Sequence, residues 1–318
     1  MSKQTHEKGI SMTNVTEIKP TSKSKLKAVD PKEAEPSKPK ILIYGKPGVG
    51  KTWTALDFPS VYYIDTEGGA DLKHYTDKLK AAGGVYFGPE QGSLDFETVI
   101  EQMQALATEK HSYKTVVIDS ISELYNLAIS KEAERLGDKD AFGASKKPAI
   151  AYMRRLLSWL ARVDMNVILI SHEKPEWGVD SKGQRAEIGT TFDAWEKIEY
   201  ALHLVLNIIK AGPNHNAKIK KTRLVGFPDS ETFKWSYQDF ADRYGKDVIE
   251  KEGKQIVLAT PKQLSELKNL LSVIKLKEGQ EEKWLEAANA QTWEEVDQEK
   301  VQKTIDYINK SYIKKGDE

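Results

Sequence analysis

The fold of this chain is decided by one stretch of sequence, Gly45-Lys46-Pro47-Gly48-Val49-Gly50-Lys51-Thr52. The stretch fits the pattern G-x-x-x-x-G-K-S/T at every fixed position. Glycines suit such a loop because backbone N–H groups must turn onto phosphate oxygens without a Cβ in the way, and the N-terminus of a following helix adds partial positive charge. We therefore predict that Lys51 reaches the β- and γ-phosphates of a nucleoside triphosphate and that Thr52 binds a magnesium ion.

The sequence on both sides of this loop agrees with that prediction. The apolar residues 41–44 predict a buried parallel strand, and the residues after Lys51 can begin a helix. This is the strand–loop–helix context that the motif requires, so a glycine-rich turn without a ligand is disfavoured. The predicted cofactors are ATP and Mg²⁺.

Length and composition limit the remaining possibilities. The chain has 318 residues, enough for one large α/β core with small additional units. Lys plus Arg and Asp plus Glu both number 48, so only a local patch would attract DNA. The sequence contains no cysteine, which excludes disulfides and thiolate chemistry. With neither a long apolar run nor a signal-peptide pattern, we expect a soluble cytoplasmic protein that does not contact a membrane.

The composition divides the chain into three predicted regions. Residues 1–38 are rich in Lys, Ser, Thr, Pro and Glu, which predicts a disordered leader. Residues 39–255 are predicted to form the main core. Residues 256–318 contain three amphipathic stretches after Thr260-Pro261, which predicts a small three-helix module with a short tail.

Acidic residues follow two further predicted strands. Residues 61–69 form a β-branched and aromatic run that ends in acidic residues and a glycine turn, which predicts a core strand whose carboxylates Asp65 and Glu67 face the nucleotide at the carboxyl edge of a parallel sheet. We favour Glu67 because it lies just beyond the strand, although it can instead begin a surface loop. A predicted helix over 95–110 leads to residues 115–119, an apolar strand that ends in Asp119. Asp119 matches the Walker B carboxylate that fixes the magnesium ion.

The residue after Asp119 distinguishes between classes of nucleotide hydrolase. Many AAA+ machines have a catalytic Glu at that position, whereas this chain has Ser120. The base must then come from elsewhere, and Glu67 at the end of a neighbouring strand is suitable. The segment Ile64-Asp65-Thr66-Glu67 resembles the RecA-like recombinase core, in which the Glu orients the attacking water. The resemblance implies an α/β fold with a mostly parallel central sheet flanked by helices.

After Ser120, a helix is predicted over 121–136. A charged, glycine-containing segment over 136–147 is a candidate mobile loop, and another amphipathic helix follows. Five basic residues form the densest cluster of the core, and they either meet phosphates or lie on a solvated helix face. These residues are Lys146, Lys147, Arg154, Arg155 and Arg162.

A fourth buried strand is predicted over 167–172, and its last residues, Ser171 and His172, are polar. In RecA-like proteins this strand ends in a polar residue that senses the γ-phosphate, usually Gln, and the resemblance implies this role for His172, with a structural role as the alternative. Residues 173–190 are polar and contain glycine, which predicts a flexible loop; by resemblance this is the second DNA-binding loop. Its charges are mixed, but Trp177 can stack on an unpaired base, worth about 1–3 kcal/mol.

Two more strands are predicted over 202–209 and 217–223, joined by the turn Gly212-Pro213-Asn214. The RecA-like resemblance implies that basic residues at the end of this hairpin reach the γ-phosphate bound by a neighbouring subunit. Lys221 and Arg223 match by position, so the complete site would exist only in a homo-oligomer; the alternative is an exposed basic edge strand that discourages aggregation. The aromatic-rich residues 231–253 are predicted to be helical.

Residues 40–255 as a whole resemble the phage single-strand annealing proteins with a shortened RecA-like core. The resemblance implies an ATPase of a phage or prophage that binds and anneals single-stranded DNA as an oligomer in the host cytoplasm. The C-terminal module would contact a single-strand-binding protein. The alternative is a nucleotide-operated loader or assembly factor for a replication protein, which the zero net charge favours and the lack of a carboxylate after Asp119 disfavours. A small-molecule kinase is disfavoured because no Arg-rich lid is found.

Overall fold

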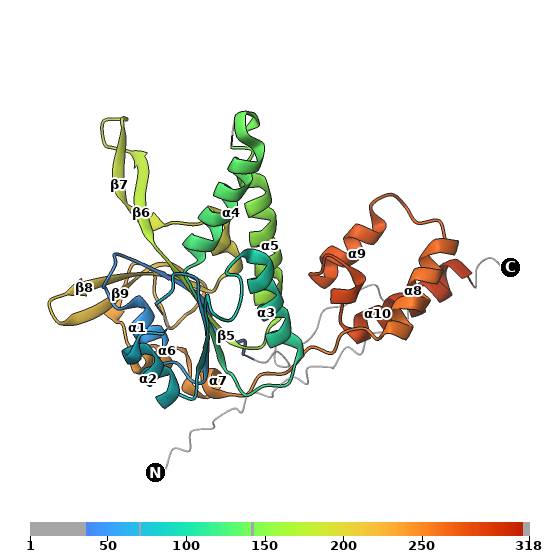
Figure 1. The fold of residues 1–318 in the computed structure, drawn as a ribbon, viewed down its shortest axis with the longest axis horizontal. Helices are drawn as coiled ribbons and strands as arrows, with labels where there is room; N and C mark the ends of the chain where they lie inside the picture. Colours follow the sequence, from blue (N-terminus) through green and yellow to red (C-terminus); the bar gives the residue numbers. More distant parts are fainter. Residues whose placement is uncertain (1–35, 70, 141–142, 314–318) are drawn as a thin grey trace, which may run out of the picture. The chain divides into compact units, whose positions relative to one another are not determined.

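The computed structural model describes residues 36–69, 71–140 and 143–313. Residues 1–35 of the predicted leader lie outside these ranges. Within the described residues, eight strands form one sheet in the order β10-β9-β8-β1-β5-β4-β2-β3. Figure 1 labels β5, β8 and β9 of this sheet. The strands are β1 (Lys40–Tyr44), β2 (Val61–Asp65), β3 (Val85–Phe87), β4 (Thr115–Asp119), β5 (Asn166–Ser171), β8 (Leu204–Ala211), β9 (Asn214–Thr222) and β10 (Thr232–Lys234).

The direction of the strands brings the predicted site residues to one edge of the sheet. Strands β8, β1, β5, β4, β2 and β3 run parallel to one another, whereas β9 is antiparallel to both β8 and β10. Strand β5 lies between β1 and β4. The carboxyl ends of β1, β2, β4 and β5 therefore share an edge, where open α/β sheets bind ligands. The predicted α/β fold with a mostly parallel central sheet is confirmed.

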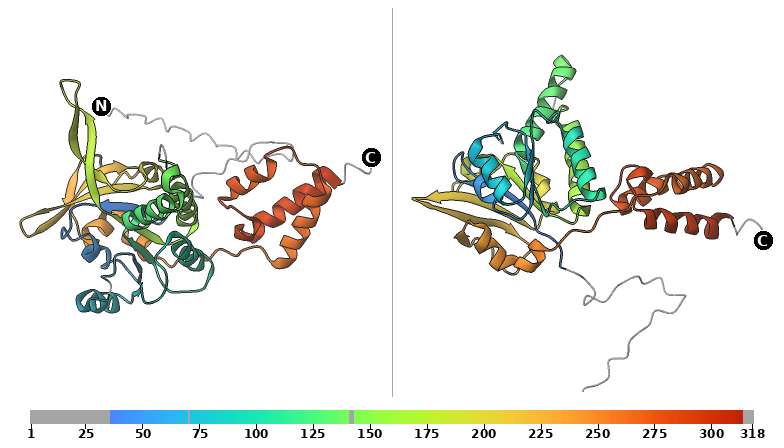
Figure 2. Two further views of the ribbon diagram at one scale, coloured as in Figure 1. Left: turned by 45° about the horizontal axis from the view of Figure 1, so that its top comes forward. Right: turned by 60° about the horizontal axis from the view of Figure 1, so that its bottom comes forward.

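Helices cover both faces of this sheet (Figure 2). Because side chains alternate along a strand, Leu42 of β1 packs in one buried cluster and its neighbours Ile41 and Ile43 pack in the other. The first cluster includes side chains of α3 (Phe96–Thr108), α4 (Ile121–Leu136) and α5 (Lys146–Arg162). The second includes side chains of α1 (Lys51–Ala55), α2 (Lys73–Ala81), α6 (Tyr237–Tyr244) and α7 (Lys246–Glu250).

The C-terminal residues form the three predicted helices. They are α8 (Pro261–Val273), α9 (Gln280–Ala288) and α10 (Gln298–Ile308), joined by a 3-10 turn over Trp293–Glu295 and followed by a π-helical turn over Asn309–Ile313. Thr260 caps α8 with Gln263 in a capping box, and Pro261 takes the first helical position. Leu267, Ala288 and Val301 belong to a buried cluster confined to this part of the chain. That the region is an independent module remains our prediction.

The structure corrects the prediction for residues 173–190. They form an antiparallel hairpin of β6 (Glu173–Val179) and β7 (Arg185–Phe192) instead of a flexible loop. The Asp180 carboxylate accepts hydrogen bonds from the N–H groups of Lys182 and Gln184 at 2.8 and 2.9 Å and so orders the turn. The polar composition hid strands that are mostly solvated on both faces.

Two further differences concern shorter elements. Residues 231–253 are not helical throughout, because Thr232–Lys234 form β10 before α6 and α7 begin; Phe233 and Trp235 are buried and Lys234 is exposed, which is strand alternation. The sequence reading also did not identify α2 and the three-residue β3. The remaining short elements are 3-10 turns at Gly137–Lys139 and Glu196–Ala201. Each helix in the described ranges is too short or too polar to cross a bilayer.

Candidate nucleotide-binding site

The phosphate-binding loop joins β1 to α1, as predicted. Gly48 and Gly50 have φ values of +75° and +88°, which residues with a Cβ rarely adopt. The Lys51 ammonium lies inside the loop, where Nζ donates to the carbonyl oxygens of Gly45 at 2.8 Å and Lys46 at 3.0 Å. Burial lowers the pKa of Lys51, and the negative charges of Asp119 and Glu67 oppose that shift. The Lys51 ammonium is therefore held where the Asp119 and Glu67 carboxylates stabilise its charge.

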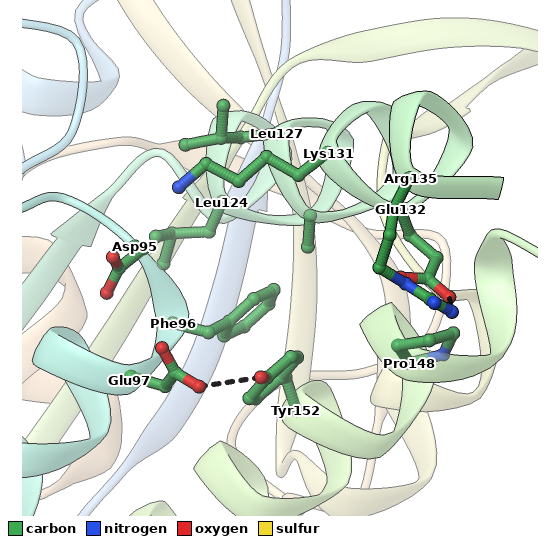
Figure 3. Close-up of a pocket in the computed structure, with 11 residues that line it drawn as sticks. Asp95, Phe96, Glu97, Leu124, Leu127, Lys131, Glu132, Arg135, Pro148 and Tyr152 are labelled. Atoms are coloured by element: carbon green, nitrogen blue, oxygen red, sulfur yellow. Dashed lines mark hydrogen bonds and ion pairs between the residues drawn. The ribbon is translucent and has the colours of Figure 1, made fainter. Parts of the chain in front are cut away.

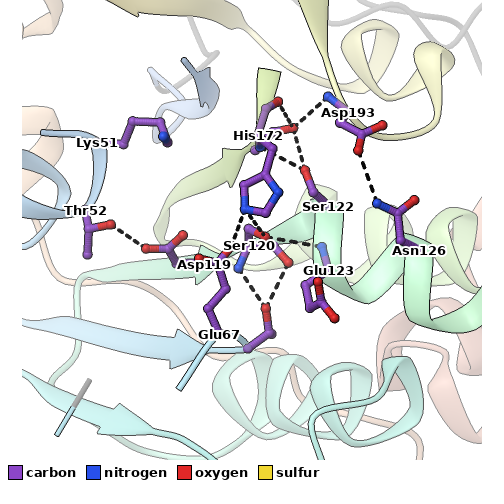
Figure 4. Close-up of polar contacts among 12 residues, drawn as sticks. Lys51, Thr52, Glu67, Asp119, Ser120, Ser122, Glu123, Asn126, His172 and Asp193 are labelled. Carbon is purple, nitrogen blue, oxygen red and sulfur yellow. Dashed lines mark hydrogen bonds and ion pairs between the residues drawn. The ribbon is translucent and has the colours of Figure 1, made fainter. Parts of the chain in front are cut away.

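The predicted magnesium ligands meet directly. Thr52 Oγ1 donates to Asp119 Oδ2 at 2.6 Å, although 67 positions separate the two residues (Figure 4). The Tyr63 hydroxyl donates to the same oxygen at 3.2 Å. Burial raises the pKa of Asp119 to about 6, which the hydrogen bonds from Thr52 and Tyr63 oppose and the charge of Glu67 reinforces. A hydroxyl beside a carboxylate is an oxygen donor set that fits Mg²⁺ shared with phosphates.

The predicted base Glu67 is positioned by its own turn. The buried Asp65 carboxylate accepts from the backbone N–H groups of Glu67 and Gly68 at 3.0 Å and of Gly69 at 2.6 Å. Asp65 therefore shapes the turn from which Glu67 reaches His172. Glu67 Oε1 accepts a hydrogen bond from His172 Nε2 at 2.5 Å. The two side chains are 42% and 47% exposed, so water reaches both of them.

Ser120 has a structural role that explains why no Glu follows Asp119. Its Oγ accepts from the N–H of Glu123 and so caps α4, while its backbone N–H donates to Thr66 Oγ1 at 2.7 Å. Thr66 also donates its own N–H to the carbonyl oxygen of Asp119 at 2.7 Å. The bond between Asp119 and Ser120 is a cis peptide. Thr66 thus ties the ends of β2 and β4 together, a role that sequence reasoning missed.

His172 joins the site to the β6–β7 hairpin. Its N–H donates to Ser122 Oγ at 2.9 Å, and its carbonyl accepts from the N–H of Asp193 at 2.9 Å. Because β6 begins at Glu173 and β7 ends at Phe192, these bonds fix the base of the hairpin. Ser120 Oγ lies 3.5 Å from His172 Nε2, the same ring nitrogen that contacts Glu67. Figure 4 shows Ser122 and Asp193 around His172.

The hairpin carries exposed apolar side chains beyond this base. Trp177, Val179 and Ile188 are 57%, 70% and 57% exposed. The Arg185 guanidinium lies 5.3 Å from the centre of the Trp177 ring. Lys174 is paired with Asp193 at 3.4 Å, close to the body of the protein. The outer part of the hairpin therefore presents an aromatic face beside a cation.

Lys221 and Arg223 lie far from the loop of their own chain. Strand β9 runs antiparallel to β8, so its end reaches the opposite edge of the sheet. There Lys221 Nζ donates to the carbonyl oxygen of Leu202, and Arg223 Nη2 donates to that of Tyr200 at 2.6 Å. The structure does not bring these residues together with the other site residues. Any contact with a γ-phosphate would require a second copy of the chain.

The predicted basic cluster on α5 is partly occupied by protein contacts. Arg155 donates to Glu295 Oε1 at 3.0 Å, and Arg162 donates to the Glu295 carbonyl at 2.6 Å. The Arg162 guanidinium also lies 4.3 Å from the centre of the Trp159 ring. These contacts favour a structural role for Arg155 and Arg162 over phosphate binding.

A pocket of about 240 Å³ lies among α3, α4 and α5 (Figure 3). Its aromatic wall is Phe96 stacked on Tyr152 at 5.8 Å, and the Tyr152 hydroxyl donates to Glu97 at 2.7 Å. Arg135 pairs with Glu132 at 2.6 Å at another side. Because these charged side chains already have partners, the phosphate-binding loop, and not this pocket, is the candidate nucleotide site.

Comparison with known proteins finds a matching family model and similar solved structures, among them the two described below. Residues 37–234 match the family model described as AAA domain, a range that includes Lys51, Glu67, Asp119 and His172. The RadB recombinase structure is 19% identical over 62% of this chain and 86% of its own, with a TM-score of 0.40. An ATPase from the type III secretion system of pathogenic bacteria is 12% identical over 86% of this chain and 79% of its own, with a TM-score of 0.37. None of the curated proteins compared with the chain matches it.

Proposed function

This chain belongs to the AAA domain family, and from that premise we propose that it is a Mg²⁺-dependent ATPase that binds single-stranded DNA. We further propose that it acts as a homo-oligomer in recombination and anneals strands for a phage or prophage. The family membership supports nucleotide binding and hydrolysis. The DNA-binding part of the proposal depends on the geometry around His172 and on the sequence resemblance described above.

The site residues divide the work of ATP hydrolysis. The loop N–H groups and Lys51 would hold the phosphates, and Thr52 and Asp119 would hold Mg²⁺, which supplies charge neutralisation when bound. Glu67 would orient the attacking water and accept its proton, since its carboxylate is accessible and lies beyond the sheet edge. Asp119 is buried and bound by Thr52, so it cannot take that role as well.

One observation carries the coupling to DNA: His172 contacts Glu67 at 2.5 Å and is followed directly by β6 of the exposed hairpin. A change in the position of Glu67 during hydrolysis would move the His172 side chain. The backbone of His172 is bonded to Ser122 and Asp193 at the hairpin base, so the movement would reach the hairpin. Conversely, DNA that fixes the hairpin would favour one position of Glu67.

The hairpin itself offers one stacking surface and few cations. Trp177 is exposed and lies beside Arg185, so an unpaired base can stack on its ring while the guanidinium meets a phosphate. Lys182 in the turn adds a second cation. Since each phosphate contact contributes a slope of about −0.7 for single strands, we expect a salt-dependence slope of only about −1.4 for each hairpin.

The basic end of β9 supports an oligomer. Lys221 and Arg223 are at the sheet edge opposite the loop, where they cannot contact the phosphates bound by their own chain. In a head-to-tail assembly, that edge would face the loop of the next subunit and supply transition-state charge. The C-terminal helices would then remain available for a single-strand-binding protein.

The test measures ATP turnover with and without single-stranded DNA, and DNA affinity, in wild type and Trp177→Ala. We expect DNA to stimulate the wild type, and the variant to bind DNA about tenfold more weakly with unchanged DNA-free turnover, because stacking is worth about 1–3 kcal/mol. Tyr307→Ala, which removes an exposed aromatic side chain from α10, is the matched control. Turnover that DNA does not change, or equal losses in both variants, would refute the proposal.

A second candidate is a nucleotide-operated loader or assembly factor for a replication protein. The observation in its favour is the separate buried cluster of α8–α10, which supplies a partner-binding unit without site residues. Pull-down experiments with a single-strand-binding protein and with a replicative helicase separate the two candidates. Capture of the helicase together with weak DNA binding would favour the loader.

A further inference from the structure

The β8–β9 hairpin braces the phosphate-binding loop at two of its glycines. A Cβ on Gly45 would lie 2.3 Å from the carbonyl oxygen of Ile208 in β8, and a Cβ on Gly50 would lie 2.6 Å from His215 Nδ1 in β9. A Cβ on Gly48, by contrast, would have no neighbour within 4 Å. A side chain at position 45 or 50 would therefore clash with this hairpin. Both positions require glycine for space as well as for the backbone conformation.

His215 also makes a directed hydrogen bond to the loop. Its Nδ1 lies 2.6 Å from the carbonyl oxygen of Val49. A carbonyl oxygen only accepts, so Nδ1 carries the proton in this contact. The His215 backbone is itself held, because its carbonyl accepts from the N–H of Trp235 at 2.8 Å and it pairs with Lys210 across the hairpin. The imidazole thus acts from a fixed strand.

The hydrogen bond from His215 to the Val49 carbonyl also determines the direction of the Gly50 N–H. In a trans peptide the C=O of one residue and the N–H of the next point in opposite directions. With the Val49 carbonyl held by His215, the N–H of Gly50 points away from β9. The Gly50 carbonyl starts α1 by accepting from the N–H of Thr54 at 3.2 Å, so both peptides around Gly50 are fixed.

We propose that His215 is a positioning residue that orients the Gly50 N–H toward the phosphates of the bound nucleotide. The inference depends on the nucleotide-binding part of the proposed function and not on DNA binding. His215 lies 163 positions beyond Thr52 in the sequence and is not part of the loop motif. It contacts the loop from β9, through the carbonyl oxygen of Val49. Without its N–H donor, the Val49–Gly50 peptide can rotate and one donor to the phosphates is lost.

Two variants separate the hydrogen bond from the packing of the ring. His215→Asn keeps an N–H donor close to the position of Nδ1, whereas His215→Phe keeps a ring of similar size without a donor. Lys218→Ala removes an exposed side chain from the same strand and is the matched control. Each protein is assayed for the affinity of a fluorescent ATP analogue, for KM and kcat, and for amide hydrogen exchange of residues 45–52 without nucleotide.

We expect His215→Phe to bind the ATP analogue about tenfold more weakly, to raise KM similarly, and to exchange loop amides faster, with kcat within about twofold of wild type. His215→Asn and Lys218→Ala should stay near wild type. Wild-type affinity and exchange in His215→Phe, or equal losses in the Asn and Phe variants, would overturn the inference. If DNA does not stimulate the wild-type protein, the proposed function is refuted, but the comparison of nucleotide affinity and loop exchange among the His215 and Lys218 variants still tests the role of His215.

Discussion

The assignment of Glu67 as the base makes the most direct prediction, because Glu67→Gln removes the charge and changes almost nothing else. The amide oxygen of Gln can still accept the hydrogen bond that His172 Nε2 now gives to Oε1 at 2.5 Å. The backbone N–H of residue 67 still donates to Asp65, so the turn keeps its shape. The substitution therefore tests proton acceptance and not the fold.

The magnitude follows from which interactions the variant keeps. A positioned general base contributes about 10²- to 10⁴-fold to a rate, so kcat should fall by at least about 100-fold. The charge of Glu67 raises the pKa of the buried Asp119 carboxyl, so its removal lowers that pKa and leaves Asp119 ionised over a wider pH range. Magnesium and nucleotide binding should then be retained, and we expect KM to change by less than about threefold.

Steady-state ATP turnover at saturating Mg²⁺ measures both constants. Glu123→Gln is the matched control, because Glu123 is an exposed carboxylate in the first turn of α4, close to the same site in Figure 4. It should retain the wild-type kcat. A kcat for Glu67→Gln within tenfold of wild type would refute the assignment of the base, and an equal loss in Glu123→Gln would point to a general electrostatic effect.

Three further predictions concern metal, assembly and stability. Thr52→Val should raise the Mg²⁺ concentration for half-maximal turnover at least about tenfold while metal-free ADP binds as before, since the variant loses a metal ligand and the hydrogen bond to Asp119 but keeps the loop N–H groups and Lys51; an unchanged Mg²⁺ titration would contradict this. Mixing inactive Lys51→Ala protein with a Lys221→Ala/Arg223→Ala double variant should restore about a quarter of the wild-type turnover, because a quarter of random interfaces pair an intact loop with an intact basic pair; no recovery would refute the shared site. Burial lowers the pKa of Lys40 from 10.5 to about 7, so between these values the unfolded chain binds more protons and stability rises with pH. Chemical denaturation should show wild type gaining up to about 1.4 kcal/mol per pH unit relative to Lys40→Met, and parallel pH profiles would contradict this.

The residues whose proximity the sequence predicted belong to motifs whose chemistry fixes their spacing and neighbours. Lys51 and Thr52 are adjacent in a loop that must wrap phosphate, and Asp119 ends an apolar strand that can only be central in the sheet. Their meeting at 2.6 Å follows from parallel strands that share a carboxyl edge. The pattern along the chain was sufficient there because local structure and chemistry require the same residues.

The residues that the sequence did not reveal act through the register of distant strands. His215 reaches Val49 only because β9 pairs with β8 and β8 with β1, and no feature near His215 in the sequence indicates a loop 166 positions away. Tyr63 likewise contacts Asp119 through the pairing of β2 with β4. Such contacts depend on long-range pairing that periodicity along one strand does not specify.

Position 120 illustrates why the base and the metal ligand come from different strands. Ser120 uses its side chain to cap α4 and its N–H to bind Thr66, which holds the ends of β4 and β2 together. A Glu there would lose the cap, which is worth about 1 kcal/mol, and its longer side chain would compete with His172 for the space beside Ser120 Oγ. Glu67 at the end of β2 avoids both conflicts and places the base in contact with the residue that begins the hairpin. The Ser after Asp119 is thus a condition for the coupling that we propose between hydrolysis and the hairpin.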